Sequence, residues 1–248
     1  MGYSDEKLLF AALLGTVTLS ATATEKETIR FATEATYPPF EFIDANNKIQ
    51  GFDVDLVNAL CEKINATCTF TNQSFDSLIP SLKFRRFDAL AAGIDITPER
   101  QKQVDFTNTY YDNSAVFISV KGTVSNTSEL KGKLVGIQNG TTHQKYLMEQ
   151  RKEIKTVPYD SYQNAILDLK NGRLDAVFGD TAVVNEWLKK NENLNTIGKK
   201  VTDKNYFGIG LGIAVRKGNK DLQDKLNKAL ADIKRDGTYD IIYKKWFK

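Results

Sequence analysis

The chain has 248 residues, of which 41% are apolar and 26% charged, a composition typical of a globular protein with one large domain or two medium ones. This composition excludes disordered and fibrous proteins. The formal net charge is +3 and the basic residues are spread along the chain, so charge gives little support to a nucleic-acid partner or a membrane surface.

The N-terminal apolar run, residues 8–19, is too short to span a bilayer, which takes about 20 apolar residues. Lys7 precedes the run and Ala21-Thr22-Ala23 follows it in small-x-small order. We therefore expect a cleavable signal peptide over residues 1–23, with the mature chain starting near Thr24. The first residues are acidic where export signals are basic, which we interpret as a replaced start. A buried N-terminal helix is the alternative.

From residue 28 onward, short apolar strands alternate with helical patterns, which predicts α/β units on a parallel sheet. The first series comprises strand 29–33, a proline loop at 37–40, helix 52–64, strand 68–70, helix 78–82 and the buried run 87–94. A similar second series comprises strand 134–137, loop 138–142, helix 143–150, strand 154–157, helix 161–169 and strand 176–179. The chain closes with strand 209–215 and helices 220–234 and 239–246.

Two segments are interpreted as connections between the two series, residues 110–114 and 201–207. Two crossings allow rigid halves to hinge around a cleft, because a few residues absorb the whole rotation. The chain is thereby divided into lobe 1, residues 28–113 and 207–248, and lobe 2, residues 114–206.

The two cysteines, Cys61 and Cys68, are seven residues apart. A disulfide suits an exported protein, and two unpaired core thiols are the alternative. The only histidine, His143, lies far along the chain, so we expect no metal site and no cofactor.

Several segments resemble the polar amino-acid-binding proteins of ABC importers, which are type II periplasmic proteins of the extracellular solute-binding family 3, and most of all their arginine-binding branch. Singly most of these motifs are weak, but their order from about residue 28 to 246 is specific. The matching stretches are residues 35–40, 51–56, 75–83, 95–100, 138–146, 171–175, 178–180 and 236–239.

The resemblance implies an α/β fold of two lobes, each a sheet flanked by helices, joined by two hinge strands. It also implies that lobe 1 is assembled from both chain ends and that Cys61 and Cys68 form a disulfide in it. We expect a monomer in the periplasm that delivers its ligand to the membrane permease subunits of an ABC importer.

Arg100 is the first candidate for ligand binding. Thr97 suits a helix N-cap and Pro98 the first helical position, so Arg100 lies in a first turn beside unpaired N–H groups, where an anion belongs. In the family the equivalent arginine binds the ligand α-carboxylate through two parallel bonds. An exposed arginine paired with Asp95 or Glu99 is the alternative.

Asp180 and Thr142 are the candidates from lobe 2. Asp180 follows strand 176–179 at the carboxyl end, where open α/β sheets place their ligands, and its family counterpart accepts bonds from the ligand α-ammonium. A plain N-cap is the alternative. Thr142 would add a second contact to the ligand carboxylate and equally suits the cap of the helix that follows.

Glu34 and Asp95 are the candidates for side-chain selectivity. Glu34 stands three residues before Tyr37, where lysine/arginine/ornithine-binding relatives carry an acid, and Asp95 replaces a small hydroxyl residue of those relatives, as in the arginine branch. Two buried acids are costly without a cation, and a guanidinium would relieve both. L-Arginine or a related cationic amino acid is therefore the expected ligand, and arginine fits better than glutamine or histidine. An exposed strand-end acid is the alternative for Glu34.

Tyr37 and Phe75 are expected to sandwich the ligand side chain, because a flat guanidinium stacks between aromatic faces. His143 aligns with a glutamine-like cleft position of relatives, and a surface histidine is the alternative. Three further residues are expected to line the cleft, and the glycine among them allows close backbone approach: Ala92, Gly93 and Gln138.

Only a closed form would satisfy all these contacts, so ligand should shift the hinge equilibrium toward closure. The prediction is a solute-binding protein and not an enzyme. One alternative is an exported dehydratase of small carboxylates on the same fold, with Glu34 and Asp95 as its acid/base pair. Another is a sensor ectodomain, which would need a transmembrane helix that no run after residue 28 is long enough to supply.

Overall fold

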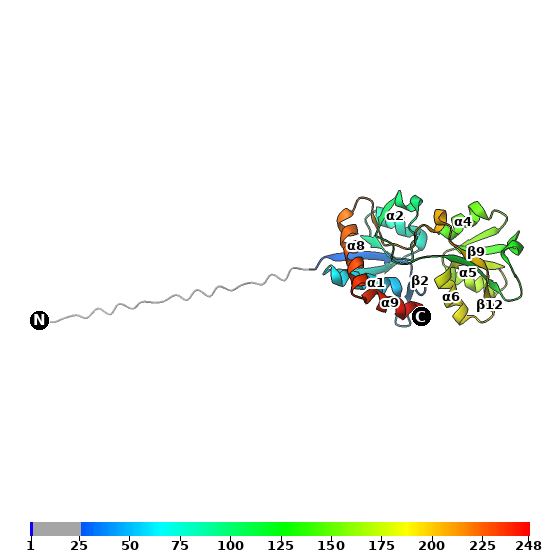
Figure 1. Cartoon of the computed structure of the whole chain (residues 1–248), viewed down its shortest axis with the longest axis horizontal. Helices are drawn as coiled ribbons and strands as arrows, with labels where there is room; N and C mark the ends of the chain where they lie inside the picture. Colours follow the sequence, from blue (N-terminus) through cyan, green and yellow to red (C-terminus); the bar gives the residue numbers. More distant parts are fainter. Residues whose placement is uncertain (2–25) are drawn as a thin grey trace.

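The computed structural model describes Met1 and residues 26–248, so the predicted signal peptide lies, apart from Met1, outside the described residues. Two five-stranded sheets divide the described chain into two halves (Figure 1). We call the sheet that contains residues 28–33 the first sheet and the other the second sheet, and each sheet with its helices a half.

The first sheet has the strand order β5-β1-β6-β13-β7. Its strands are β1 (Thr28–Thr33), β5 (Thr67–Asn72), β6 (Ala89–Leu90), β7 (Val104–Phe106) and β13 (Ala214–Arg216). β1 runs parallel to β5 and β6, whereas β13 is antiparallel to β6 and β7. The chain therefore returns near its end to complete the sheet that it began.

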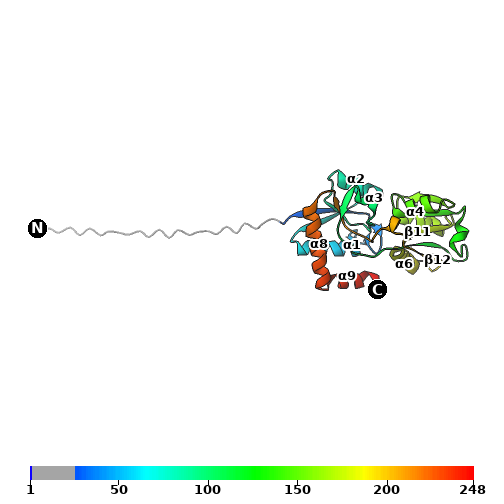
Figure 2. The same cartoon turned by 45° about the horizontal axis from the view of Figure 1, so that its top comes forward.

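Helices α1 (Phe52–Lys63), α8 (Lys220–Arg235) and α9 (Thr238–Phe247) pack against one another on this half (Figure 2). α2 (Leu78–Lys83) contacts β6 and β13. α8 shows why the sequence folds this way, because its buried residues recur three to four positions apart and so form one apolar face: Leu222, Leu226, Ala229, Leu230 and Ile233.

The second sheet has the order β10-β9-β11-β8-β12. Its strands are β8 (Ala115–Val120), β9 (Leu134–Gln138), β10 (Lys155–Tyr159), β11 (Ala176–Asp180) and β12 (Leu194–Val201). β9 is parallel to β10 and β11, and β8 is antiparallel to β11 and β12. The helices of this half are α4 (Thr142–Gln150), α5 (Tyr162–Lys170), α6 (Thr181–Lys190) and α7 (Lys204–Phe207).

A small antiparallel sheet, β2 (Thr36–Tyr37), β3 (Glu41–Ile43) and β4 (Ile49–Gln50), follows β1. It was not expected, since the sequence predicts only a proline loop here. Three short helices complete the described chain: η1 (Phe75–Ser77), α3 (Pro98–Gln101) and η2 (Thr127–Leu130).

Two segments connect the halves and are hydrogen-bonded to each other. Tyr110 N–H donates to the Leu211 carbonyl and Leu211 N–H donates to the Tyr111 carbonyl, both at 2.9 Å. The predicted strand 209–215 is a strand only over its last part, β13, because the residues before it belong to this crossing. The predicted linker 201–207 is also partly helical, and Phe207 packs in the core of the second half.

The hydrophobic core is continuous between the halves in this conformation. One cluster surrounds β6 and α2, and a second lies against β8 and β9. The largest cluster contains residues of both halves and includes the stacked rings of Tyr37 and Tyr162, whose centres are 5.5 Å apart. The structure is therefore closed.

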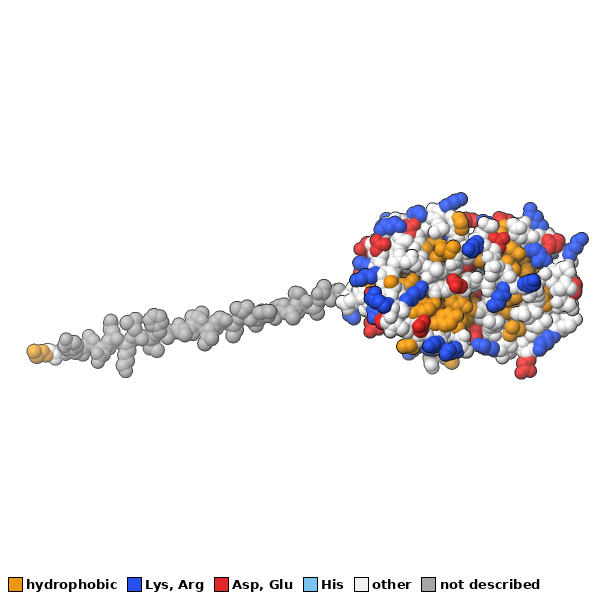
Figure 3. Space-filling view, in the orientation of Figure 1, with side chains coloured by type: hydrophobic (Ala, Val, Ile, Leu, Met, Phe, Trp, Pro, Cys, Tyr) orange, Lys and Arg blue, Asp and Glu red, His pale blue; other side chains and the backbone are white. Residues whose placement is uncertain are grey.

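Cys61 at the end of α1 and Cys68 in β5 form a disulfide, with their Cα atoms 6.2 Å apart. The unpaired-thiol alternative is wrong. Within residues 26–248, no helix is long and apolar enough to cross a membrane. Positive and negative side chains are interspersed over the face drawn in Figure 3, in keeping with the small net charge.

Candidate ligand-binding site

A cavity lies between the two halves, and its free volume of about 10 Å³ is close to the space of a single water. Its lining comes from seven residues before the first crossing and five from the second half. They are Glu34, Tyr37, Glu41, Phe75, Gly93, Asp95 and Arg100, and Gln138, Thr141, Thr142, His143 and Asp180. Nearly all the predicted ligand-binding residues thus meet at one place.

Arg100 is held as the sequence predicts. The Thr97 side chain caps α3 by accepting from the Arg100 N–H at 3.2 Å, and Pro98 is the first helical residue. Arg100 as a residue is 8% exposed. Its guanidinium donates through Nη1 to the main-chain oxygen of Asp95 at 3.1 Å and lies 5.5 Å from the centre of the Phe75 ring. Glu99 pairs with Lys145 instead, so the exposed ion-pair alternative for Arg100 is wrong.

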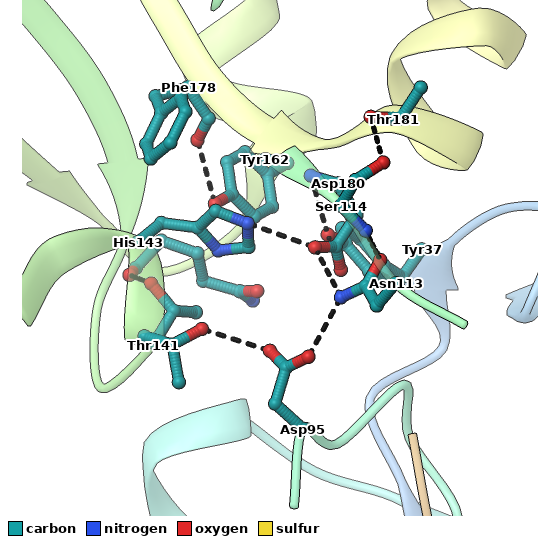
Figure 4. A network of polar contacts seen from close by, with 12 residues as sticks. Tyr37, Asp95, Asn113, Ser114, Thr141, His143, Tyr162, Phe178, Asp180 and Thr181 are labelled. Carbon is teal, nitrogen blue, oxygen red and sulfur yellow. Dashed lines mark hydrogen bonds and ion pairs between the residues drawn. The ribbon is translucent and has the colours of Figure 1, made fainter. Parts of the chain in front are cut away.

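Asp180 ends β11 and precedes α6, but its carboxylate makes no capping bond. It accepts instead from Tyr37 Oη at 2.7 Å and from Asn113 Nδ2 at 2.8 Å, and lies 3.0 Å from His143 Nε2 (Figure 4). The plain N-cap alternative for Asp180 is therefore wrong, because the side chain faces the other half.

Both oxygens of the Asp95 carboxylate accept hydrogen bonds from residues that lie outside the first sheet. Its Oδ1 accepts from Asn113 Nδ2 at 2.8 Å and its Oδ2 from the Thr142 hydroxyl at 2.9 Å. Burial, and then the nearby charge of Asp180, raise the pKa of Asp95 to about 7. A negative charge on Asp95 is therefore costly unless a partner compensates it.

The cap of α4 is Thr141 and not Thr142. The Thr141 hydroxyl accepts from the Gln144 N–H, while its own proton goes to the Gln138 carbonyl. Thr142 is the first residue of the helix, and this position leaves its hydroxyl to reach Asp95 across the cleft. The sequence places two threonines in a row and gives no basis for choosing between them.

Further buried acids surround the cavity. Glu34 is 4% exposed and accepts from the Thr36 hydroxyl, so the exposed strand-end alternative is wrong. Glu41 on β3 is fully buried, and neither of its carboxylate oxygens has a hydrogen-bond partner within the described chain. Burial raises the pKa of Glu34, and burial together with Asp53 raises the pKa of Glu41 well above its usual range.

His143 is 2% exposed, so the surface alternative is wrong. Its ring lies edge-on to Phe178, and its Nε2 faces Asp180 while Nδ1 has no partner within the described residues. No group of three His, Cys, Asp or Glu side chains in residues 26–248 is placed to hold a metal ion.

Of the four remaining predicted residues, three line the cavity and one does not. The Gly93 backbone has φ +54°, and a Cβ there would meet the Tyr37 ring at 3.4 Å, so glycine permits this close approach. The Gln138 amide donates to the Asp160 carbonyl at 3.0 Å. Phe75 lines the cavity, but Ala92 does not, because it belongs to the buried core cluster around β6 and α2.

The outer edge of the cavity carries contacts between the halves. Asn139 Nδ2 donates to Asp76 Oδ2 at 3.1 Å, and Lys145 forms an ion pair with Glu99. Gly140 lies so close that a Cβ there would be 3.0 Å from Asp76 Cβ. These contacts require the two halves to be closed.

Sequence reasoning missed three residues of the site: Glu41, Asn113 and Thr141. Glu41 sits in the short middle strand of the small sheet, and its burial depends on the distant residues Asp53 and Gly93. Asn113 falls in a segment predicted only as a linker. No local sequence pattern distinguishes Asn113 or Thr141. Glu41 offers one weak signal, since it is a charged residue directly after the predicted proline loop and could have been tested as an acid of the cleft.

The site combines carboxylates with one guanidinium between two closing halves, an arrangement suited to a ligand with several charged groups. A family model of the bacterial extracellular solute-binding proteins, family 3, matches residues 29–248. The chain belongs to this family. It is a solute-binding protein and not an enzyme, and the predicted resemblance and fold class are confirmed.

Similar proteins of this solute-binding family are known from enteric bacteria. The Escherichia coli K12 proteins named putative ABC transporter arginine-binding protein 2 and ABC transporter arginine-binding protein 1 are 68% and 63% identical to it, each over 98% of this chain and 99% of their own. A solved Salmonella typhimurium periplasmic binding protein, described as having high arginine specificity, is 51% identical, has a TM-score of 0.87, and covers 90% of this chain and 100% of its own.

Proposed function

We propose that the chain is the periplasmic solute-binding component of an ABC amino-acid importer and binds L-arginine by closure of two lobes. The observation that carries the proposal is the charge of the cavity. Four carboxylates, those of Glu34, Glu41, Asp95 and Asp180, line it against the single guanidinium of Arg100. A cation with one carboxylate would balance this set far better than a neutral amino acid. The relatives named for arginine binding support the same ligand.

Each charged group of arginine has a partner in the proposal. Arg100 binds the α-carboxylate, since its fork suits two parallel bonds, and Thr142 adds a contact. Asp180 binds the α-ammonium. Glu34 and Asp95 face the guanidinium, and to these we add Glu41, whose carboxylate oxygens have no partner in the described chain.

The remaining side chains shape the pocket around the ligand. Tyr37 covers one face of the ligand side chain, and its other contacts, the Tyr162 stack and the Asp180 bond, hold the ring in place. Phe75 covers the opposite face beside Arg100. Gly93, Gln138 and His143 line the pocket, whereas Ala92 belongs to a core cluster and does not line it.

The predicted lobes are residues 28–113 with 207–248 and residues 114–206. The membership of the two sheets supports this division, although Phe207 itself packs with the second half. The free volume of about 10 Å³ cannot admit an amino acid, so the lobes must open for entry and the side chains must make way. Because ligand contacts come from both lobes, arginine favours the closed form, which the permease subunits then recognise.

We place the mature protein in the periplasm as a monomer, exported through a signal peptide over residues 1–23. The small-x-small sequence before Thr24 supports this. The mass of the protein recovered from the periplasm should correspond to a start near Thr24.

Calorimetric titration of the purified protein with arginine, lysine, ornithine, histidine and glutamine tests the ligand. Arginine should bind tightest, because it alone offers the acidic end a planar, always charged group with five N–H donors. Tighter binding of glutamine or histidine would refute the proposal. Turnover of a small ring carboxylate would instead favour the dehydratase alternative.

A further inference from the structure

Asn113 lies in the first crossing, between β7 and β8, and its amide group contacts both cleft carboxylates. Nδ2 donates to Asp95 Oδ1 and to Asp180 Oδ1, each at 2.8 Å (Figure 4). Oδ1 accepts from the Ser114 N–H at 2.9 Å. Only this orientation of the amide satisfies all three contacts, because an amide oxygen cannot donate to a carboxylate.

The segment that carries Asn113 is attached to the second half. The Ser114 carbonyl accepts from the Thr181 N–H at 2.7 Å, and the two hydroxyls lie 2.8 Å apart. Thr181 directly follows Asp180, so Asn113 and Asp180 belong to one rigid piece. The bond to Asp95, by contrast, joins this piece to the first half.

Asp95 and Asp180 are each 2% exposed and share one amide nitrogen as a hydrogen-bond donor. Like charges this close repel strongly when water is excluded, and Asp180 contributes to the raised pKa of Asp95. An amide with two N–H groups is the one uncharged side chain of this size that can donate to both carboxylates at once.

We propose that Asn113 is the positioning residue that allows the cleft to carry Asp95 and Asp180 side by side, one for the side chain of the ligand and the other for its ammonium. This inference rests on the proposed function. It adds that Asp95 can select the side chain of the ligand only while residue 113 donates hydrogen bonds. The effects of substitutions at positions 95 and 113 on arginine affinity should therefore not be additive.

Two substitutions separate this role from simple filling of space. Asn113→Asp keeps the shape of the side chain but removes both donors and adds a third carboxylate at the same point. Asn113→Ala removes donors and shape but adds no charge. If Asn113 only fills space, Asp should be the milder change; if it positions the carboxylates, Asp should be the more severe.

The experiment is calorimetric titration to millimolar arginine at pH 7.5 of both variants, each alone and combined with Asp95→Ser. We expect Asn113→Ala to weaken binding roughly tenfold and Asn113→Asp at least a further tenfold, since hydrogen bonds to charged groups are the strong ones. In the Asp95→Ser background the cost of Asn113→Asp should fall at least tenfold, because the repelling partner is gone.

The matched control is Asp112→Ala, an exposed neighbour on the same segment, which should bind arginine within about twofold of the unmutated protein. Thermal unfolding of every variant verifies that it folds. Equal or tighter binding by Asn113→Asp than by Asn113→Ala would overturn the inference. So would a loss of the same size in both backgrounds, including loss of all detectable binding in both. Absence of arginine binding by the unmutated protein would overturn the proposed function, and the inference with it.

Discussion

The Arg100 guanidinium keeps most of its donors for a partner outside the protein. A guanidinium has five N–H groups, and Arg100 makes one side-chain hydrogen bond within residues 26–248, to the main-chain oxygen of Asp95. The Thr97 cap and the Phe75 ring hold the side chain where it is. The group is therefore fixed in position yet free in hydrogen-bonding capacity, which suits recognition of a carboxylate.

Arg100→Lys should weaken arginine binding by roughly 10- to 100-fold, because lysine retains the charge but loses the two parallel bonds. Calorimetry with arginine and with argininamide, which lacks the carboxylate, measures the effect. The variant should bind argininamide nearly as well as the unmutated protein does. Arg86→Lys, at an exposed position, is the control. An equal loss for both ligands would contradict the role given to Arg100.

At this scale the sequence predicts residues whose local pattern has a single meaning. The Thr97-Pro98 pair predicts the start of α3 and so the position of Arg100 in its first turn. The apolar strand that precedes Asp180 predicts that Asp180 lies at the carboxyl end of that strand. Glu41 and Asn113 could not be predicted, because their importance comes from residues distant in sequence that fold against them. When a segment distant in sequence buries an acid, the residues next to that acid show no pattern that predicts it.

At the scale of elements, an acid pair joins β3 to the start of α1. Glu41 from the strand and Asp53 from the helix are both fully buried. Asp53 accepts from the Gly93 N–H at 2.9 Å and from the Tyr110 hydroxyl at 2.7 Å, and burial raises its pKa to about 6. Asp53 thereby holds the backbone of the glycine that lines the cavity.

Glu41→Gln should raise the unfolding temperature of the ligand-free protein at pH 8 by roughly 2–8 °C. The pKa of Glu41 is higher in the folded than in the unfolded chain, so its contribution to stability is complete below about 4.5 and is lost as the pH rises. Glutamine does not titrate and avoids this loss. Scanning calorimetry at pH 5 and pH 8 should show a smaller gain at pH 5.

The matched control for this change is Glu62→Gln, at an exposed position of α1, which should leave the unfolding temperature within about 1 °C. A gain for Glu41→Gln that is the same at both pH values would show that Glu41 does not titrate as described. The same variant should also bind arginine less tightly, so that stability and function oppose each other at this position.

The helices follow directly from apolar spacing, and α1, α5, α8 and α9 begin and end within one or two residues of the prediction. The small β2-β3-β4 sheet, α6 and β12 were not predicted. β2 and β4 have two residues each, too few for an alternating pattern to be recognised. The strand that became β13 was expected in a parallel sheet but is antiparallel. Strand direction depends on how the chain crosses between the halves and not on side-chain pattern, so the sequence could not predict it.

At the scale of the whole molecule, closure brings acids together. Asp95 from the first half meets Asp180 from the second, with Asn113, Thr142, His143 and Arg100 around them. An open cleft would return water to Asp95 and its pKa to the ordinary range. Closure without ligand therefore takes up a proton at Asp95.

The ligand-free protein should be more closed at pH 5.5 than at pH 8. The pKa of Asp95 is raised to about 7 in the closed form, so the preference for closure is complete below the ordinary value near 4 and is lost as the pH rises through 7. Small-angle X-ray scattering should show a smaller radius of gyration at pH 5.5, and saturating arginine should remove the difference.

Asp95→Asn is the matched variant, and its radius of gyration should not change between these pH values. Persistence of the same pH effect in Asp95→Asn would assign it to a group other than Asp95. The sequence predicts two halves and a double crossing from the repeated series of elements. It cannot predict which conformation the halves adopt, because the open and closed forms share the same local structure.

The disulfide between Cys61 and Cys68 uses both cysteines of the chain, and neither lines the cavity. A single thiol introduced near the mouth of the cleft would therefore be the only reactive one in the molecule. Met148 lies there, 59% exposed, in a groove lined by both halves. A solvatochromic dye coupled to Met148→Cys would change its emission as the halves approach, which makes the protein a ready scaffold for an optical amino-acid sensor.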